Sequence, residues 1–90
     1  MKANMTRTQA AAIAKDLIEG GINARYTAQL TAESHGVSIA VVRKIRRTLL
    51  RGIEAVKLLG GGKEEYNRHI CSMADSIENG WEDANLNLKP

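Results

Sequence analysis

Residues 28–47 read AQLTAESHGVSIAVVRKIRR, and this stretch decides how the rest of the chain is interpreted. It holds two segments of helical length on either side of Gly36. A left-handed backbone costs little only for glycine, so Gly36 is suited to end the first segment. Ser38 follows as a candidate N-cap, and Val42 and Ile45 recur at the spacing of one helix face. The stretch therefore predicts two short helices joined by a tight turn.

The same stretch resembles the helix-turn-helix unit of prokaryotic DNA-binding proteins, and the resemblance covers residues 28–47 of the 90-residue chain. In that family a small residue lies where the helices cross, a glycine forms the turn, and apolar residues at three further positions tie the helices together. Two positions depart from this pattern, because Thr31 and His35 replace apolar or small residues, and we expect Leu30 to take the core place of Thr31. The matching residues are Ala32, Gly36, Val37, Val42 and Ile45.

The resemblance implies a recognition helix at about residues 38–50 that enters the major groove of double-stranded DNA. The window 43–51 holds five basic residues and no acidic one. Such side chains neutralise phosphates, and arginine also pairs with guanine, while small apolar residues contact thymine methyl groups. A hydroxyl at the start of the helix, together with backbone N–H groups, suits a phosphate. The expected DNA-binding residues are Ser38, Ile39, Ala40, Arg43, Lys44, Arg46, Arg47 and Arg51.

Charge is distributed unevenly along the chain. The net charge is only +3, but residues 1–63 carry 11 basic and 4 acidic side chains, whereas residues 64–90 carry 2 basic and 6 acidic ones. Such asymmetry favours a polyanionic partner. We expect the acidic last third to face away from DNA.

The remaining segments also read as helices, which predicts an all-α bundle of four to five helices. Thr6 and Gln9 form a capping-box pattern that starts a helix at about 7–19. A second helix follows Thr27 as N-cap, and the last one spans 63–79. The expected organisation is one domain at 1–80 and a loosely held polar tail at 81–90, with Trp81 covering the edge of the core.

The segment 53–70 has two readings. In one, the recognition helix continues toward Leu59 with a kink or break at Gly52, since glycine inside a helix costs about 1 kcal/mol relative to alanine. In the other, residues 53–70 form a β-hairpin that turns at Gly60–Gly62, as in winged-helix regulators. The all-α reading is preferred because IEAVKLL, from Ile53, lacks the alternation of a strand.

The last predicted helix carries an apolar stripe that has two interpretations. It packs within the chain, or it forms the interface of a two-fold dimer that presents two recognition helices to two half-sites. The two uses are compatible. We expect a homodimer. The candidate dimerisation residues are Tyr66, Ile70, Met73 and Ile77.

The sequence shows no constellation that would support catalysis or a cofactor. His69 and Cys71 are two residues apart and thus face different sides of a helix, which argues against zinc, and Cys71 is expected to be a small buried side chain. Glu64 follows the GGGK run where a phosphate loop needs serine or threonine. We therefore expect no enzyme, no metal, no cofactor and no small-molecule ligand.

The composition supports a cytoplasmic, nucleoid-associated protein. One cysteine closes no internal disulfide, no leader follows Met1, and no apolar run is long enough to span a membrane. The first functional hypothesis is a sequence-specific DNA-binding regulator or repressor of phage or plasmid type. The alternatives are a protein-binding inhibitor or accessory factor on the same scaffold, and a non-specific architectural DNA-binding protein.

Overall fold

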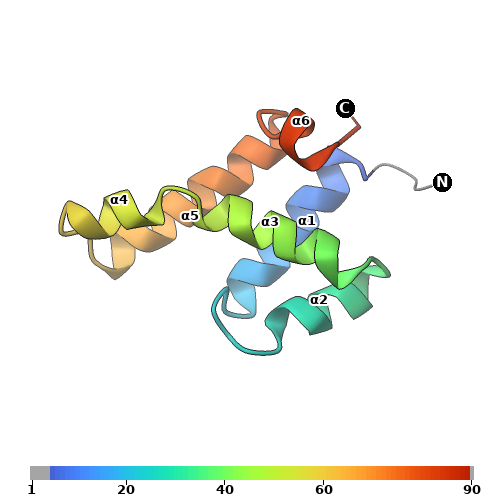
Figure 1. The fold of residues 1–90 in the computed structure, drawn as a ribbon, viewed down its shortest axis with the longest axis horizontal. Helices are drawn as coiled ribbons and strands as arrows, with labels where there is room; N and C mark the ends of the chain where they lie inside the picture. The colour runs from blue at the N-terminus through green and yellow to red at the C-terminus, as the bar shows by residue number, and fades with distance from the viewer. Residues whose placement is uncertain (1–4, 90) are drawn as a thin grey trace.

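The computed structural model describes residues 5–89, and within this range it contains helices and no strand (Figure 1). The all-α class is confirmed, and the β-hairpin alternative for residues 53–70 is wrong. Residues 1–4 of the predicted domain and Pro90 of the predicted tail lie outside the described residues. The helices are α1 (Arg7–Glu19), α2 (Thr27–His35), α3 (Ile39–Leu50), α4 (Ile53–Leu58), α5 (Lys63–Glu78) and α6 (Asp83–Leu86).

Helix α1 has the predicted bounds and forms the centre of the fold. The Thr6 hydroxyl accepts a hydrogen bond from the backbone N–H of Gln9 at 3.1 Å, which caps the first turn. Ile13 and Leu17 are fully buried, and the small side chains of Ala10 and Ala14 let other helices approach closely. Helix α1 therefore contacts α2, α3 and α5.

Helix α2 begins one residue earlier and is rotated differently from the prediction. Thr27 is its first helical residue and not its N-cap, and the Thr27 hydroxyl donates to the carbonyl oxygen of Gly20 at 2.9 Å. Thr27 and Thr31 lie one turn apart on the buried face, whereas Leu30 is 62% exposed. The expectation that Leu30 replaces Thr31 in the core is wrong, because the bond from Thr27 to the end of α1 fixes the face that α2 turns inward.

The turn between α2 and α3 forms as predicted around Gly36. This glycine has φ 65° and ψ 33°, which is the left-handed conformation. The Gly36 and Val37 N–H groups donate to the carbonyl oxygens of Glu33 and Ala32. The Ser38 hydroxyl then accepts from the Val41 N–H at 3.4 Å and caps α3. Two short helices thus follow one another across a turn of three residues.

Helix α3 ends at Leu50 and the chain breaks at Gly52, as the cost of a helical glycine predicts. Gly52 has φ 84°, and α4 starts directly after it. The His69 ring lies against this break, where a ring nitrogen donates to the Arg51 carbonyl oxygen at 2.6 Å. A side chain of α5 thereby satisfies a carbonyl group at the end of α3.

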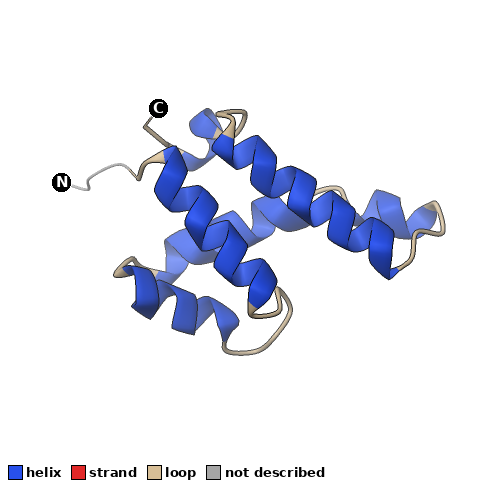
Figure 2. Cartoon of the chain, turned by 180° about the vertical axis from the view of Figure 1, so that it is seen from behind, coloured by secondary structure: helices blue, strands red, loops and turns tan. Residues whose placement is uncertain are grey.

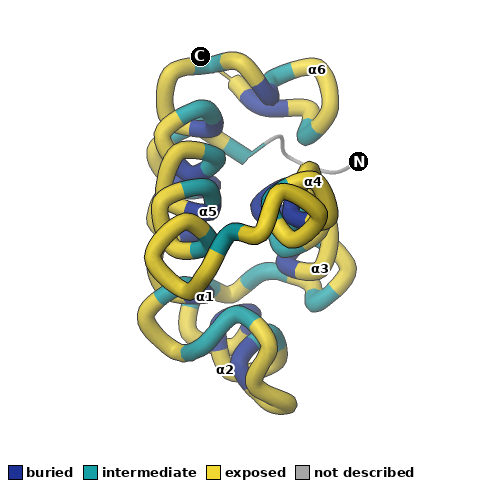
Figure 3. Tube along the Cα trace, turned by 90° about the vertical axis from the view of Figure 1, so that its left-hand side faces the viewer, coloured by how far each residue is buried: buried dark blue, intermediate teal, exposed yellow. Residues whose placement is uncertain are grey.

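The helices pack in two layers around one core. Helix α3 crosses in front of α1 and α5 in Figure 1, and the view from behind brings α1 and α5 forward (Figure 2). Figure 3 shows the buried positions turned toward the space between these helices. The molecule extends over 44 × 27 × 16 Å. The largest fully buried side chains are those of Ile13, Leu17, Val42, Ile45, Leu49 and Ile77.

Residues 82–89, here called the C-terminal segment, are docked and not loose. The Lys89 N–H donates to the Met5 carbonyl oxygen at 2.8 Å, and the Arg7 N–H donates to the Lys89 carbonyl oxygen at 3.1 Å. Leu88 is buried in the core beside these bonds. Trp81 is 80% exposed, so the expectation that it covers the core edge is wrong. Leu88 supplies the apolar anchor instead.

Candidate nucleic-acid interface

The outer face of α3, here called the basic face, consists of four exposed residues at helical spacing: Ala40, Arg43, Lys44 and Arg47. Steps of three and four residues place these side chains on one stripe. The opposite stripe of α3 lies in the core. Burial on one side fixes the direction in which the three cations point. The helix therefore presents them outward as one continuous surface.

The three cations of the basic face are free. Within residues 5–89, Arg43, Lys44 and Arg47 form no ion pair and no side-chain hydrogen bond. No described residue compensates their charge, which is therefore available to an anionic partner.

Arg46 is basic but belongs to the fold and not to the basic face. Its Nε donates to the Ile22 carbonyl oxygen at 2.8 Å, and its Nη2 lies 3.5 Å from the Asn23 side-chain oxygen. Both partners belong to the turn between α1 and α2. Arg46 is half-buried and holds this turn against one side of α3. The sequence predicted Arg46 as a DNA contact, and the structure gives this side chain a role within the fold.

The C-terminal segment borders the other side of α3. Arg51 Nη2 donates to Glu82 Oε2 at 2.6 Å, and Asn85 Nδ2 donates to Thr48 Oγ1 at 3.1 Å. Glu82 is buried and also accepts a hydrogen bond from Asn85 Nδ2 at 3.2 Å. Arg51 was expected to be free for DNA, but a carboxylate holds it. The acidic last third was expected to face away from DNA, but Glu82 lies beside the end of α3 and pairs with Arg51.

A second ion pair neutralises the next acidic residue of this segment. Arg7 forks onto both carboxylate oxygens of Asp83, with its Nε 3.0 Å from each. The hydrogen bond from Arg7 holds the pKa of Asp83 below its ordinary value, and the same bond raises the pKa of Arg7. Glu82 and Asp83 therefore place no unpaired negative charge next to the basic face.

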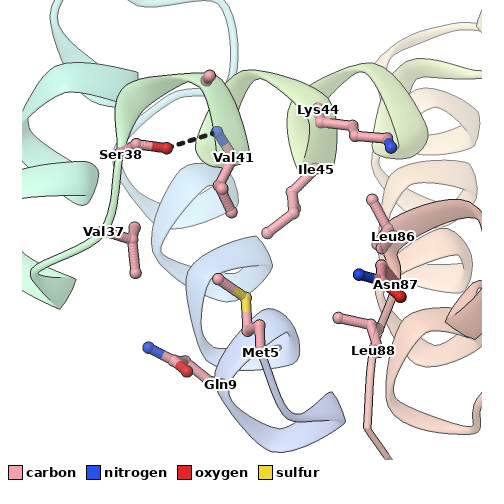
Figure 4. A pocket seen from close by; sticks show the side chains of 11 residues that line it. Met5, Gln9, Val37, Ser38, Val41, Lys44, Ile45, Leu86, Asn87 and Leu88 are labelled. Carbon is pink, nitrogen blue, oxygen red and sulfur yellow. Dashed lines mark hydrogen bonds between the residues drawn. The ribbon is translucent and has the colours of Figure 1, made fainter. Parts of the chain in front are cut away.

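A groove of about 650 Å³ opens between α3, the start of α1 and the C-terminal segment (Figure 4). Its walls are mostly apolar, with Met5, Val41 and Leu88 among them. Ala40 and Lys44 belong both to this groove and to the basic face. The groove is thus the apolar flank of the basic surface.

Two further predicted contacts at the start of α3 have different positions. Ser38 is exposed at the N-terminus of α3, where its hydroxyl serves as the cap. Ile39 is half-buried and packs against the core. The sequence predicted Ile39 as a base contact, and the structure shows that part of its side chain holds α3 against the core.

The predicted dimerisation stripe of α5 is used within the chain. Ile70 and Ile77 are buried in the core, and Tyr66 and Met73 pack against it half-buried. Because the chain's own helices cover Ile70 and Ile77, neither side chain is available to a second subunit. The stripe at 63–79 is thus explained by packing of α5 against the other helices.

Other titratable side chains within the described residues serve the fold or remain at the surface. His35 Nε2 lies 2.6 Å from Asp16 Oδ2 and links α2 to α1. Cys71 is exposed, so the prediction of a buried thiol is wrong. No group of three or more potential metal ligands exists among residues 5–89. No helix in this range has the length and apolar character needed to cross a membrane.

The sequence did not predict the residues of the C-terminal segment that bond to side chains beside the basic face. Glu82, Asn85 and Asp83 contact residues that lie 31 to 76 positions away in the chain. Contacts of this separation leave no local pattern in the sequence, so no signal was available to find them.

Comparison of the chain with protein-family models, with curated proteins and with solved structures gives no match in any of the three.

Proposed function

We propose that the chain binds double-stranded DNA in a sequence-specific manner, with α2 and α3 acting as a helix-turn-helix. The observation that carries this proposal is the free basic face of α3, because the buried opposite stripe directs Arg43, Lys44 and Arg47 outward together. The major groove, about 12 Å wide, admits an α-helix. The basic face then meets phosphates and base edges.

The surroundings of the basic face support a DNA partner. Arg46 fixes the turn on one side, and the C-terminal segment lies on the other with Glu82 and Asp83 neutralised by arginines. A rigid helix with free cations and compensated neighbouring carboxylates suits a polyanion. We infer a role as a transcriptional regulator that occupies an operator as a dimer, without enzymatic activity, in the cytoplasm at the nucleoid.

The salt dependence of duplex binding tests this proposal. If each of the three free cations contacts one phosphate, the slope of log affinity against log salt is about −2.7 per chain, which is roughly a 40-fold loss between about 50 and 200 mM salt. The double variant Arg43→Ala/Arg47→Ala should keep a slope of about −0.9 per chain. Fluorescence anisotropy with a labelled random-sequence duplex measures both slopes.

The matched control removes two positive charges from the other layer of the molecule. Lys15 and Arg68 lie on α1 and α5 and are exposed, so Lys15→Ala/Arg68→Ala should leave the slope unchanged. Equal slopes for the parent and the α3 variant would reject the basic face as the DNA contact. A parent chain with no duplex affinity at low salt would instead favour the protein-binding class.

Sequence specificity needs its own measurement. Selection of bound fragments from a random duplex pool should yield a consensus with two-fold symmetry, because a dimer reads two half-sites about 34 Å apart. Selected and random duplexes that bind equally well would favour an architectural, non-specific role.

A further inference from the structure

The part of the molecule that the proposed function leaves unexplained is an arm formed by α4, the loop 59–62 and the first turns of α5. The arm forms one end of the molecule along its longest axis (Figure 1). Helix α4 packs against α5, and Ile53 anchors its first residue in the core. Only Arg51 and Gly52 separate the arm from α3. The orientation of the arm is therefore coupled to that of α3.

The tip of the arm exposes two adjacent leucines on an ordered backbone. Leu58 is 86% exposed and Leu59 is 88% exposed. The N–H groups of Leu59, Gly60 and Gly61 donate to carbonyl oxygens of α4, at 3.1, 3.0 and 2.9 Å. These bonds close the helix end in the way typical of a Schellman turn. The leucines are thus held outward by a defined turn.

The turn is held from both sides of the loop. The Gly62 N–H donates to a Glu65 carboxylate oxygen at 3.2 Å, which starts α5. A side chain on Gly61 would come within 2.6 Å of a Val56 methyl carbon, so the loop packs closely on α4. Two apolar side chains on so tightly closed a turn form a small but preformed contact surface.

The charges around the leucines are of both signs. The tip carries two lysines and three glutamates, and Lys57 lies 3.6 Å from Glu54 and over the Tyr66 ring. A surface of mixed sign offers little to DNA or to an anionic membrane. A second copy of the same tip carries the same two signs, so a two-fold axis through the leucines allows lysines of one copy to face glutamates of the other. The charged residues of the tip are Glu54, Lys57, Lys63, Glu64 and Glu65.

We propose that the tip of the arm, with Leu58 and Leu59 at its centre, is the surface through which two copies of this chain associate. This inference rests on the proposed function for its purpose, since the arm then sets the separation of two α3 helices on DNA. The interface is small compared with the roughly 1,200–2,000 Å² of stable complexes, so association of the free chains is weak. Adjacent half-sites on DNA strengthen it by raising the effective concentration.

Sedimentation equilibrium of the full chain without DNA tests the proposal independently of DNA binding. The parent should dimerise reversibly between about 10 and 500 μM, as expected for an interface of this size. The variant Leu58→Glu/Leu59→Glu should raise the dimer dissociation constant at least tenfold or remain monomeric. Its circular dichroism and melting should match the parent, because both side chains are exposed. Leu30→Glu is the matched control, since this leucine is exposed on α2 and should leave dimerisation unchanged.

The outcomes are decisive in both directions. A parent that stays monomeric throughout this range, or a double variant that dimerises like the parent, overturns the proposed surface. Equal weakening by Leu30→Glu also overturns it, because the effect would then not be local to the tip. Salt-dependent duplex binding by a monomeric parent would leave DNA binding by the basic face standing and would reject the arm as the surface that joins two copies.

Discussion

The basic face and the surface that borders it, here called the rim, are both rich in arginine, but their charged groups have different partners. The rim consists of Arg46, Arg51 and Arg7 with the residues that they contact. Arg46 is bonded to the turn before α2, and Arg51 and Arg7 are bonded to carboxylates of the C-terminal segment. Arg43 and Arg47 have no such partner within the described part of the chain. A count of charges along the sequence treats these residues alike. The hydrogen-bond and ion-pair partners of each side chain show which cations stabilise the fold and which are available to a ligand.

The largest effect expected from this comparison is the loss of stability when Arg46 is replaced. Arg46→Ala removes a charged donor from the Ile22 carbonyl oxygen and should lower the free energy of unfolding by about 1–2 kcal/mol. Arg43→Ala, at an exposed position on the same helix, should change it by less than about 0.5 kcal/mol. Urea unfolding followed by circular dichroism measures both. If both variants lowered the free energy of unfolding equally, the distinction between arginines bonded within the fold and free arginines would be wrong.

The pair Arg7–Asp83 gives the rim a pH dependence. Because the folded-state pKa of Asp83 is lowered by Arg7, its stabilising contribution is present above the ordinary aspartate pKa and is lost as the pH falls through the lowered value. Asp83→Asn should therefore lower the melting temperature at neutral pH, with the difference disappearing in strong acid, below the pKa of the folded state. Thermal melts of parent and variant across this range measure the difference. A deficit that persisted unchanged in acid would assign the effect to packing and not to the charge of Asp83.

The smallest expected effect concerns the bond between Glu82 and Arg51. Glu82→Gln removes the charge that holds Arg51 beside the basic face. We expect duplex affinity to rise a few-fold and the salt slope to steepen by up to about one unit, as one more cation becomes available to a phosphate. Glu78→Gln removes the same charge from α5 and is the control. Anisotropy titrations in which both variants behave alike would indicate a general effect of net charge.

The sequence predicted those parts of the fold whose signals are local. Thr6 and Gln9 define the start of α1, and Gly36, Ser38 and Gly52 define the turn and the two ends of α3. In these cases the residue that sets the boundary lies within a few positions of it. The periodic apolar residues Val42 and Ile45 then identified the inner face of α3.

The failures concern positions decided by distant contacts. Leu30 is more apolar than Thr31, yet the bond between Thr27 and Gly20 sets the rotation of α2 and turns Leu30 outward. The ion pair between Arg51 and Glu82 joins residues 31 positions apart, and no local sequence pattern predicts it. Composition at 81–90 indicated a loose tail, because its polar residues gave no sign of their partners at the other end of the chain.

The docking of residues 82–89 against residues 5–7 also affects the order of folding. Helices α2 and α3 contact each other across a short turn, so this pair forms with little loop-closure entropy. The ion pair between Arg7 and Asp83 spans 76 positions, and contacts of such separation form slowly. Docking of the C-terminal segment is therefore the contact whose formation costs the most loop-closure entropy.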